Sequence, residues 1–164
     1  MKTLITQCGG DDLDPTQLRF AETHEWVFEK DGVATIGLCA FPVGLGVIGR
    51  VELLGLGTKV KRLDKIGELE SGKAVCDALS PLSGEIIQVN EVVVKKPHMV
   101  SNDPFGDGWL IKLKADDLSE LDHLMNFKEY QESAFAGQHH WRTRAGSMAT
   151  RNTRRQQEPR WRMR

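Results

Sequence analysis

The segment around Lys73 contains the residues best suited to present a reactive group. Residues 68–79, ELESGKAVCDAL, place Ser-Gly-Lys between two runs of alternating apolar and polar residues. Alternation of this kind is typical of β-strands, so the break predicts a tight hairpin turn with Lys73 at its exposed tip. The nearest other basic residues are Lys65 and Lys95, so a modifying enzyme would find one lysine locally. The alternative is an ordinary solvated lysine, as most exposed lysines are.

Cysteines and histidines offer a second possible chemistry. Cys39 or Cys76 could act as the nucleophile of an enzyme, with His24 or His98 as the base. No local motif supports such a pair, and a lone cysteine on an apolar strand is more often part of the core. Two histidines at 139–140 could bind a metal ion, but two adjacent ligands in a polar tail are weak evidence for a site.

The elements that must position these residues are short strands. Residues 24–28 and 33–38 flank an Asp-Gly turn and predict a β-hairpin. Further strands are expected over residues 50–54, 58–61, 66–70, 74–79, 85–89 and 109–114. The apolar residues 40–49, interrupted by a proline and three glycines, predict a tight turn or a frayed helix. Many short strands at this spacing predict a mainly β, antiparallel sandwich or barrel.

Helical structure is expected after residue 115. Leucines and a methionine fall at helical spacing over residues 118–125. Asn126, followed three residues later by Glu129, resembles a capping box and predicts a short helix over residues 127–135.

Charge divides the chain into an acidic body and a basic tail. Residues 137–164 contain eight arginines and one acid, a net charge of +7, so the remaining residues carry −8 of the total of −1. The tail lacks apolar periodicity and is predicted to be disordered. We therefore expect a polar leader (residues 1–18), one folded domain (residues 19–136) and an Arg-rich tail (residues 137–164). The tail could bind nucleic acid or a membrane, contact the acidic body, or have no function.

Cysteine spacing and the amino terminus bear on location. Three cysteines without a CxxC pair favour a reducing compartment. No apolar run approaches the ~20 residues that span a bilayer. The amino terminus resembles neither a secretory signal nor an Arg-rich transit peptide. These features predict a cytoplasmic protein, with a mitochondrial location as the lesser alternative.

Glu70-Ser71-x-Lys73-Ala74 is followed by Ser80-Pro81-x-Ser83-Gly84-Glu85. On these and further motifs the chain resembles the H proteins of the glycine cleavage system over about residues 18–136. Residues 70–85, with Glu-Ser-x-Lys-Ala and Ser-Pro-x-Ser-Gly-Glu, are similar to that family's lipoylation segment. Other matching motifs follow in the same order, at Thr23–Val27, Thr35–Gly37, Val51–Leu53, Gly57–Val60, Asn90–Glu91, Asp103–Lys112 and Ser119–Leu121.

Two related classes of carrier are less similar. A biotin carrier usually has Met-Lys-Met at its modification site, whereas this chain has Gly72-Lys73-Ala74. A lipoyl domain of a 2-oxoacid dehydrogenase also places an acid before Lys-Ala. The Trp-containing strand at 24–28 and the Asp-Pro-Phe-Gly-Asp-Gly-Trp segment at 103–109 favour the H type instead.

The resemblance implies a flattened antiparallel β-barrel or sandwich of the lipoyl/biotinyl hammerhead type, with a carboxy-terminal helix. Lys73 would carry lipoate through an amide bond, attached by a lipoate ligase or octanoyltransferase. The protein would be a non-catalytic carrier of the aminomethyl group of glycine. Its partners would be glycine decarboxylase, aminomethyltransferase and dihydrolipoyl dehydrogenase, which supply the chemistry.

The resemblance also assigns roles to residues around the lysine. Glu70 and Gly84 match positions associated with recognition by the lipoate-attaching enzyme. Thr23, Glu25 and Asp77 match positions that line the groove sheltering the arm. Acids there are chemically reasonable, because an aminomethyl ammonium head is cationic. The alternative for the two acids is that they are solvated strand-end residues.

Several residues depart from the family's pattern. Gly72 stands where the family commonly has valine, and Cys76 replaces a small polar residue. Residues 40–47 lack a polar helical segment, often with His and Gln, that the family shows there. An H-like lipoyl carrier or a lipoate relay outside glycine cleavage is therefore the alternative function. His24 and Trp26 are expected to be structural.

Overall fold

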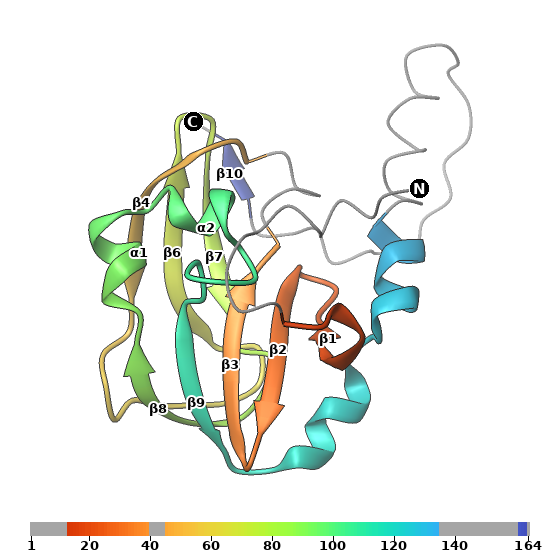
Figure 1. Cartoon of the computed structure of the whole chain (residues 1–164). Coiled ribbons are helices and arrows are strands. Elements are labelled where there is room, and N and C mark those ends of the chain that lie inside the picture. The colour runs from red at the N-terminus through yellow and green to blue at the C-terminus, as the bar shows by residue number, and fades with distance from the viewer. Residues whose placement is uncertain (1–12, 40–44, 135–160, 164) are drawn as a thin grey trace.

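Two antiparallel β-sheets pack face to face in the part of the chain that the computed structural model describes, residues 13–39, 45–134 and 161–163 (Figure 1). In these residues the sheets have six strands, β1-β2-β3-β9-β8-β5, and four strands, β10-β7-β6-β4. The strands are β1 (Arg19–Phe20), β2 (Glu25–Lys30), β3 (Val33–Leu38), β4 (Ile48–Leu53), β5 (Lys59–Val60), β6 (Lys65–Ser71), β7 (Ala74–Leu79), β8 (Gly84–Val89), β9 (Ile111–Ala115) and β10 (Trp161–Met163). The predicted mainly β, antiparallel fold is confirmed, as an open sandwich in these residues rather than a closed barrel.

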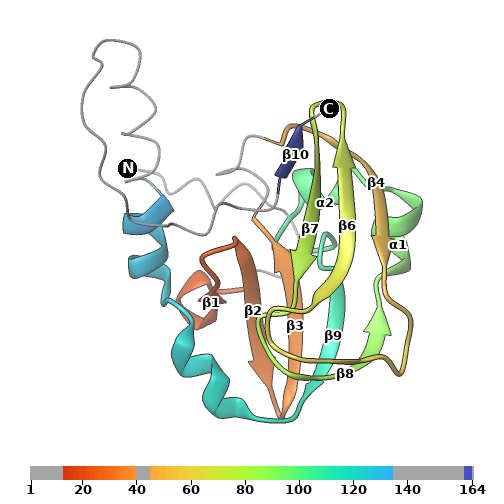
Figure 2. The same cartoon turned by 180° about the vertical axis from the view of Figure 1, so that it is seen from behind.

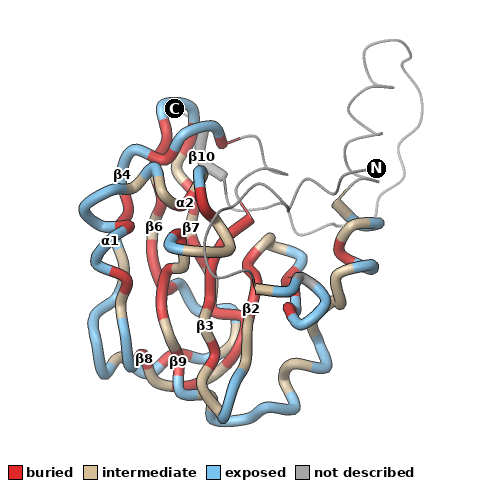
Figure 3. Tube along the Cα trace, in the orientation of Figure 1, coloured by how far each residue is buried: buried red, intermediate tan, exposed pale blue. Residues whose placement is uncertain are grey.

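The core lies between the two sheets, and buried residues alternate with more exposed ones along several strands (Figure 3). On β7 the buried residues are Ala74, Cys76 and Ala78, and those between them are partly exposed. Leu69 of β6 and Ile111 of β9 belong to the same buried cluster, so both sheets contribute to it. Each large apolar side chain gains about 1.5–3 kcal/mol on burial. A register slip by one residue would lose that gain along the whole strand.

The first predicted hairpin is confirmed, and local chemistry explains its turn. Strands β2 and β3 pair from Glu25↔Leu38 to Lys30↔Val33. Asp31 and Gly32 both have positive φ, 54° and 80°, as the tight turns of two-residue hairpins require.

Two short helices between β8 and β9 were not predicted. They are α1 (Glu91–Lys95) and α2 (Met99–Asn102). Asn90 caps α1, since its side chain accepts a hydrogen bond from the Val92 backbone N–H at 3.0 Å. The three consecutive valines of α1 favour a strand by propensity, but only Val93 is buried. Both helices lie against β4, at the outer edge of the second sheet (Figure 1).

The helical region after residue 115 is split into two parts. Leu118–His123 forms a 3₁₀ helix instead of the α-helix that the leucine spacing predicted. The carboxy-terminal helix over residues 127–134 is confirmed, together with its capping box. The Asn126 N–H donates to Glu129 Oε2 at 2.9 Å, and the Glu129 N–H donates to Asn126 Oδ1 at 3.0 Å.

The folded part extends beyond the boundaries predicted at both ends. Pro15–Gln17 forms a 3₁₀ turn and Leu18 is buried, so structure begins within the predicted polar leader. Trp161–Met163 forms β10, although the whole tail was predicted to be disordered. Residues 40–44, in the predicted turn or frayed helix, lie outside the described residues, as does the histidine pair at 139–140. Within the described residues, no helix has the length and apolar character needed to cross a membrane.

Candidate functional site

The hairpin of β6 and β7 projects from one end of the sandwich (Figure 2), and its turn contains Gly72 and Lys73. Ser71, which is buried, organises this turn. Its Oγ accepts hydrogen bonds from the backbone N–H groups of Lys73 and Ala74, both at 3.2 Å, and donates to the Ala74 carbonyl at 3.4 Å. A hydroxyl can make all three bonds at once, so one side chain fixes the backbone from which the lysine extends.

Lys73 is exposed at the end of the hairpin, as predicted. None of the ion pairs within the described part of the chain includes its ammonium group. A Cβ added to Gly72 would meet nothing within 4 Å, so the turn does not require glycine there. The surroundings of Gly72 therefore leave room for a side chain at this position.

Glu70 lies on β6, one residue before the end of that strand. It pairs with Val75 of β7, and its half-buried side chain lies 3.8 Å from the Arg50 guanidinium. An acid is thus held close to the lysine by two neighbouring strands. Its predicted role in recognition by a modifying enzyme stays a prediction.

Thr23 and Glu25 come together at the start of β2. The Thr23 hydroxyl donates to Glu25 Oε2, and the Leu79 backbone N–H donates to Glu25 Oε1 at 2.9 Å. Glu25 is 1% exposed, so the alternative of a solvated strand-end residue is wrong for it. Since Leu79 ends β7 in the other sheet, this carboxyl group links the two sheets.

Burial dominates the electrostatics around Glu25. It raises the pKa of Glu25 to about 7, although the hydrogen bonds from Thr23 and Leu79 oppose the change. Burial also raises the pKa of the Cys76 thiol to about 12, and the nearby carboxylates of Glu25 and Asp77 add to the effect. The carboxyl groups of Glu25 and Asp77 are therefore both close enough to Cys76 to affect its ionisation.

Asp77 lies on β7 and forms an ion pair that the sequence did not predict. Its Oδ1 is 2.7 Å from the Nζ of Lys65, which also lies 2.8 Å from Glu68 Oε2. The hydrogen bond to Asp77 is the main cause that raises the pKa of Lys65. Asp77 is thus half-buried and paired with a lysine. No sequence signal marks this pair, because it depends on the bulge that shifts the β6–β7 register between Lys65 and Gly67.

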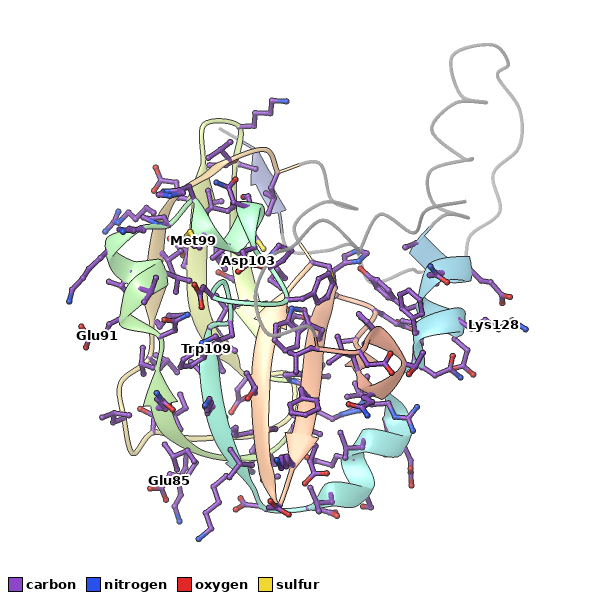
Figure 4. The ribbon with its side chains drawn as sticks, in the orientation of Figure 1. Glu85, Glu91, Met99, Asp103, Trp109 and Lys128 are labelled. Atoms are coloured by element: carbon purple, nitrogen blue, oxygen red, sulfur yellow. The ribbon has the colours of Figure 1, made fainter. Side chains whose placement is uncertain are left out.

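His24 and Trp26 have structural contacts, in line with the prediction. His24 Nδ1 lies 2.9 Å from the Tyr130 hydroxyl, and Trp26 is fully buried. The Trp26 Nε1–H donates to the Pro104 carbonyl at 3.0 Å. Asp103, labelled in Figure 4, begins this loop and accepts a hydrogen bond from the Asp107 N–H at 2.8 Å. The predicted Asp-Pro-Phe-Gly-Asp-Gly motif is therefore a loop that packs against the β2 tryptophan.

Gly84 lies apart from the other predicted site residues. It begins β8, and its neighbour Glu85 lies at the end of the sandwich opposite the β6–β7 turn (Figure 4). A Cβ at Gly84 would be 2.1 Å from the Lys114 carbonyl oxygen and 3.0 Å from Leu113 Cγ. The close approach of β9 is sufficient reason for glycine here, and its recognition role stays a prediction.

The structure gives no support to the nucleophile and metal hypotheses. Cys39 and Cys76 are both buried, and the raised pKa of Cys76 disfavours the reactive thiolate. His24 bonds to a tyrosine hydroxyl through Nδ1. Among the residues that the structure describes, no cluster of three or more potential ligands could hold a metal ion.

Two antiparallel sheets with a lysine in an exposed hairpin turn agree with the lipoyl/biotinyl hammerhead fold that the sequence resemblance implies. Residues 18–136 match the family model described as glycine cleavage H-protein. The chain therefore belongs to the glycine cleavage H-protein family.

Individual relatives agree with this family. The glycine cleavage system H protein of Alteromonas mediterranea is 46% identical over 121 residues, covering 73% of this chain and 94% of that protein. The probable glycine cleavage system H protein of Aeropyrum pernix is 42% identical over 117 residues, covering 71% and 82%. The crystal structure of a glycine cleavage system H protein from Mycobacterium marinum superimposes with a TM-score of 0.66. That structure is 31% identical, and the match covers 77% of this chain and 99% of that chain.

Proposed function

We propose that this protein is the lipoyl carrier of a glycine cleavage system, with lipoate attached to Lys73 through an amide bond. The observation that carries the proposal is an exposed hairpin lysine, held by Ser71, within a chain that matches H proteins from residue 18 to 136. Attachment would remove the charge of the lysine. When bound, lipoate supplies a flexible arm ending in a dithiolane, which accepts the group derived from glycine and can be reduced and reoxidised.

The residues along β7 fit such an arm. Asp77 lies four positions after Lys73 along the extended strand, about 13 Å away at ~3.3 Å per residue. An extended lysine-lipoyl arm has about thirteen bonds of ~1.5 Å, so it reaches about 16 Å after allowance for the zigzag. Asp77 is therefore within reach. Leu79, which donates to Glu25, is six positions from Lys73, about 20 Å by the same count and beyond that reach. Contact with Glu25 therefore relies on its carboxyl group lying near Cys76, three positions from Lys73.

These carboxylates would hold a cationic aminomethyl head. Charge-assisted hydrogen bonds to an ammonium are stronger than neutral ones, and Thr23 orients the Glu25 carboxyl group. Asp77 already forms an ion pair with Lys65. An incoming ammonium group would therefore have to share the Asp77 carboxylate with Lys65 or displace the lysine from it. Burial raises the pKa of Glu25 to about 7, so the carboxyl group is mostly ionised only above about that pH. We propose that Glu25 binds the head group best in neutral to alkaline solution.

The remaining roles follow from the same proposal. Glycine decarboxylase, aminomethyltransferase and dihydrolipoyl dehydrogenase would act on the arm in turn, and the carrier itself would perform no catalysis. Tethering raises the effective concentration of the arm at each of these partners. Glu70 and Gly84 are proposed to contribute to recognition by a lipoate ligase or octanoyltransferase. Bacterial and archaeal relatives support a cytoplasmic location.

Intact mass spectrometry of the natively expressed protein tests the attachment. We expect one lipoyl adduct in the wild type and none in Lys73→Arg, which keeps the charge but cannot form the amide under these conditions. Unmodified wild-type protein from a lipoate-competent host would refute the proposal.

A second assay separates the two functions left open by the sequence. The lipoylated protein is incubated with glycine, tetrahydrofolate, NAD⁺, glycine decarboxylase and the two other enzymes, and NADH formation is followed. Turnover supports the glycine cleavage role. A lipoylated protein that the decarboxylase cannot use would instead be an H-like carrier or lipoate relay outside glycine cleavage.

A further inference from the structure

The carboxy-terminal strand β10 lies beside the strand that follows Lys73. It pairs antiparallel with β7, in the register Trp161↔Cys76, Arg162↔Val75 and Met163↔Ala74. Both views show β10 against the upper part of β7, close to the β6–β7 turn (Figures 1 and 2). This strand is outside the residues 18–136 that match the H-protein family, so the family match does not account for it.

β10 closes an edge that would otherwise be open. In the described residues the second sheet has the order β10-β7-β6-β4, so β7 would be its edge strand without β10. The opposite edge, β4, is approached by α2, whose Ser101 Oγ accepts a hydrogen bond from the Ile48 N–H at 3.2 Å. An uncovered edge presents a row of unpaired backbone donors and acceptors, to which another extended chain can add. β10 supplies that chain from within the same molecule.

Charge favours the same contact. The tail from residue 137 onward carries a net +7. The three strands that form the sheet with β10 contain four acids against two bases, a net charge of −2. The acids are Glu52, Glu68, Glu70 and Asp77, and the bases are Arg50 and Lys65. Attraction between exposed charges extends about 10 Å at 0.1 M salt, which is enough to act between adjacent strands.

We propose that β10 is an intramolecular cover strand that restricts the access of modifying enzymes to Lys73. The inference rests on the proposed function, since it concerns attachment of lipoate. Met163 pairs with Ala74, the residue next to Lys73, and neighbouring strands lie about 5 Å apart. An enzyme that encloses the lysine therefore meets β10 at the side of the turn, and its reaction proceeds from molecules in which β10 has detached.

The attachment reaction also strengthens the cover. Lipoate and ATP form a lipoyl adenylate with release of pyrophosphate. The Lys73 ammonium loses a proton, and the resulting amine attacks the adenylate carbonyl, giving the amide and releasing AMP and a second proton. The hairpin loses one positive charge in this step. The acidic strands are then less neutralised, so β10 is held more tightly on β7 after modification than before it.

Amide hydrogen exchange and a lipoylation assay on the full chain test the proposal. Arg162→Pro/Met163→Pro is the test variant. Successive residues of a strand direct their N–H groups to opposite sides, so one of these prolines removes a donor to β7. Asn152→Pro/Thr153→Pro places the same number of prolines in the tail outside β10 and is the control. Lipoylation is measured with a lipoate ligase, lipoate and ATP.

We expect the alternate β7 amides over residues 74–76 that face β10 to exchange at least roughly tenfold faster in the test variant than in the wild type and the control. Initial lipoylation should rise roughly threefold to tenfold in the test variant, because the rate scales with the uncovered fraction. Raising the salt concentration should move the wild type toward the test variant, because salt screens the attraction of the tail.

Two results would refute the cover-strand proposal. The first is that the β7 amides are unprotected in the wild type. The second is that all three chains are lipoylated at equal rates although the test variant has lost its β7 protection. Failure of every chain to accept lipoate would instead refute the proposed function. The exchange data report on β10 in either case, so the two failures are distinguishable.

Discussion

Replacing Glu25 with glutamine tests the carboxyl group that links the two sheets. Glutamine is nearly the same size, can accept the Leu79 N–H bond, and cannot ionise. Burial raises the pKa of Glu25 from its usual 4.5 to about 7, so the folded protein binds this proton more tightly than the unfolded chain does. The corresponding stability is fully present below about pH 4.5. It is lost as the pH rises through 7.

The size of the effect follows from the pKa values. A change from 4.5 to about 7 corresponds to about 3 kcal/mol in the free energy of unfolding, at 1.36 kcal/mol per pKa unit. The wild type should therefore lose about 3 kcal/mol relative to Glu25→Gln between pH 4.5 and 8. Glu25→Gln should be the more stable of the two at pH 8, because its amide oxygen accepts from the Leu79 N–H and its NH₂ group donates to the Thr23 hydroxyl, which turns to accept.

Urea unfolding at pH 4.5, 6, 7 and 8 measures this difference directly. The comparison between variant and wild type cancels the contributions of other titrating groups, including His24, whose pKa is lowered by burial. Glu22→Gln, at an exposed position in the same turn, is the control and should leave the pH dependence of the wild type unchanged. Parallel curves for Glu25→Gln and wild type would refute the argument that burial holds this carboxyl group in its protonated form near neutrality.

Three further predictions test other parts of the site. Gly84→Ala should destabilise the fold by about 2 kcal/mol or more in urea unfolding, because its Cβ would lie 2.1 Å from a β9 carbonyl oxygen. Gly72→Ala, with open space around its Cβ, should change stability by less than about 0.5 kcal/mol; equal effects would contradict the packing role of Gly84. Asn90→Ala should cost about 2–4 kcal/mol by the same measurement, because it removes a helix cap and two bonds to carbonyls at 2.6 and 2.7 Å; a cost under 1 kcal/mol would contradict this. Lys65→Met should cost less than about 1 kcal/mol, since the lysine is 44% exposed, and should lower the KM of glycine decarboxylase for the lipoylated protein by freeing Asp77; an unchanged KM would exclude Asp77 from binding the head group.

The sequence by itself determined the features that depend on near neighbours in the chain. The alternation along residues 74–79 predicted β7, and the Asp-Gly pair at 31–32 predicted the first hairpin turn. Asn126 and Glu129 predicted the capping box. The same local logic placed Lys73 in an exposed turn. These features are readable because strand alternation, turn conformation and helix capping are each set within a few residues.

Only the tertiary structure decided the environment of the site residues. Glu25 is buried because β2 packs against the end of β7, whose Leu79 N–H lies 54 positions away in the chain. Asp77 meets Lys65 through a bulged register, and Gly84 is confined by the approach of β9. β10 joins the sheet from a tail that shows no apolar periodicity. Burial, cross-strand pairing and close backbone contact all arise between segments that are distant in sequence. The pattern of neighbouring residues in the sequence therefore cannot predict them.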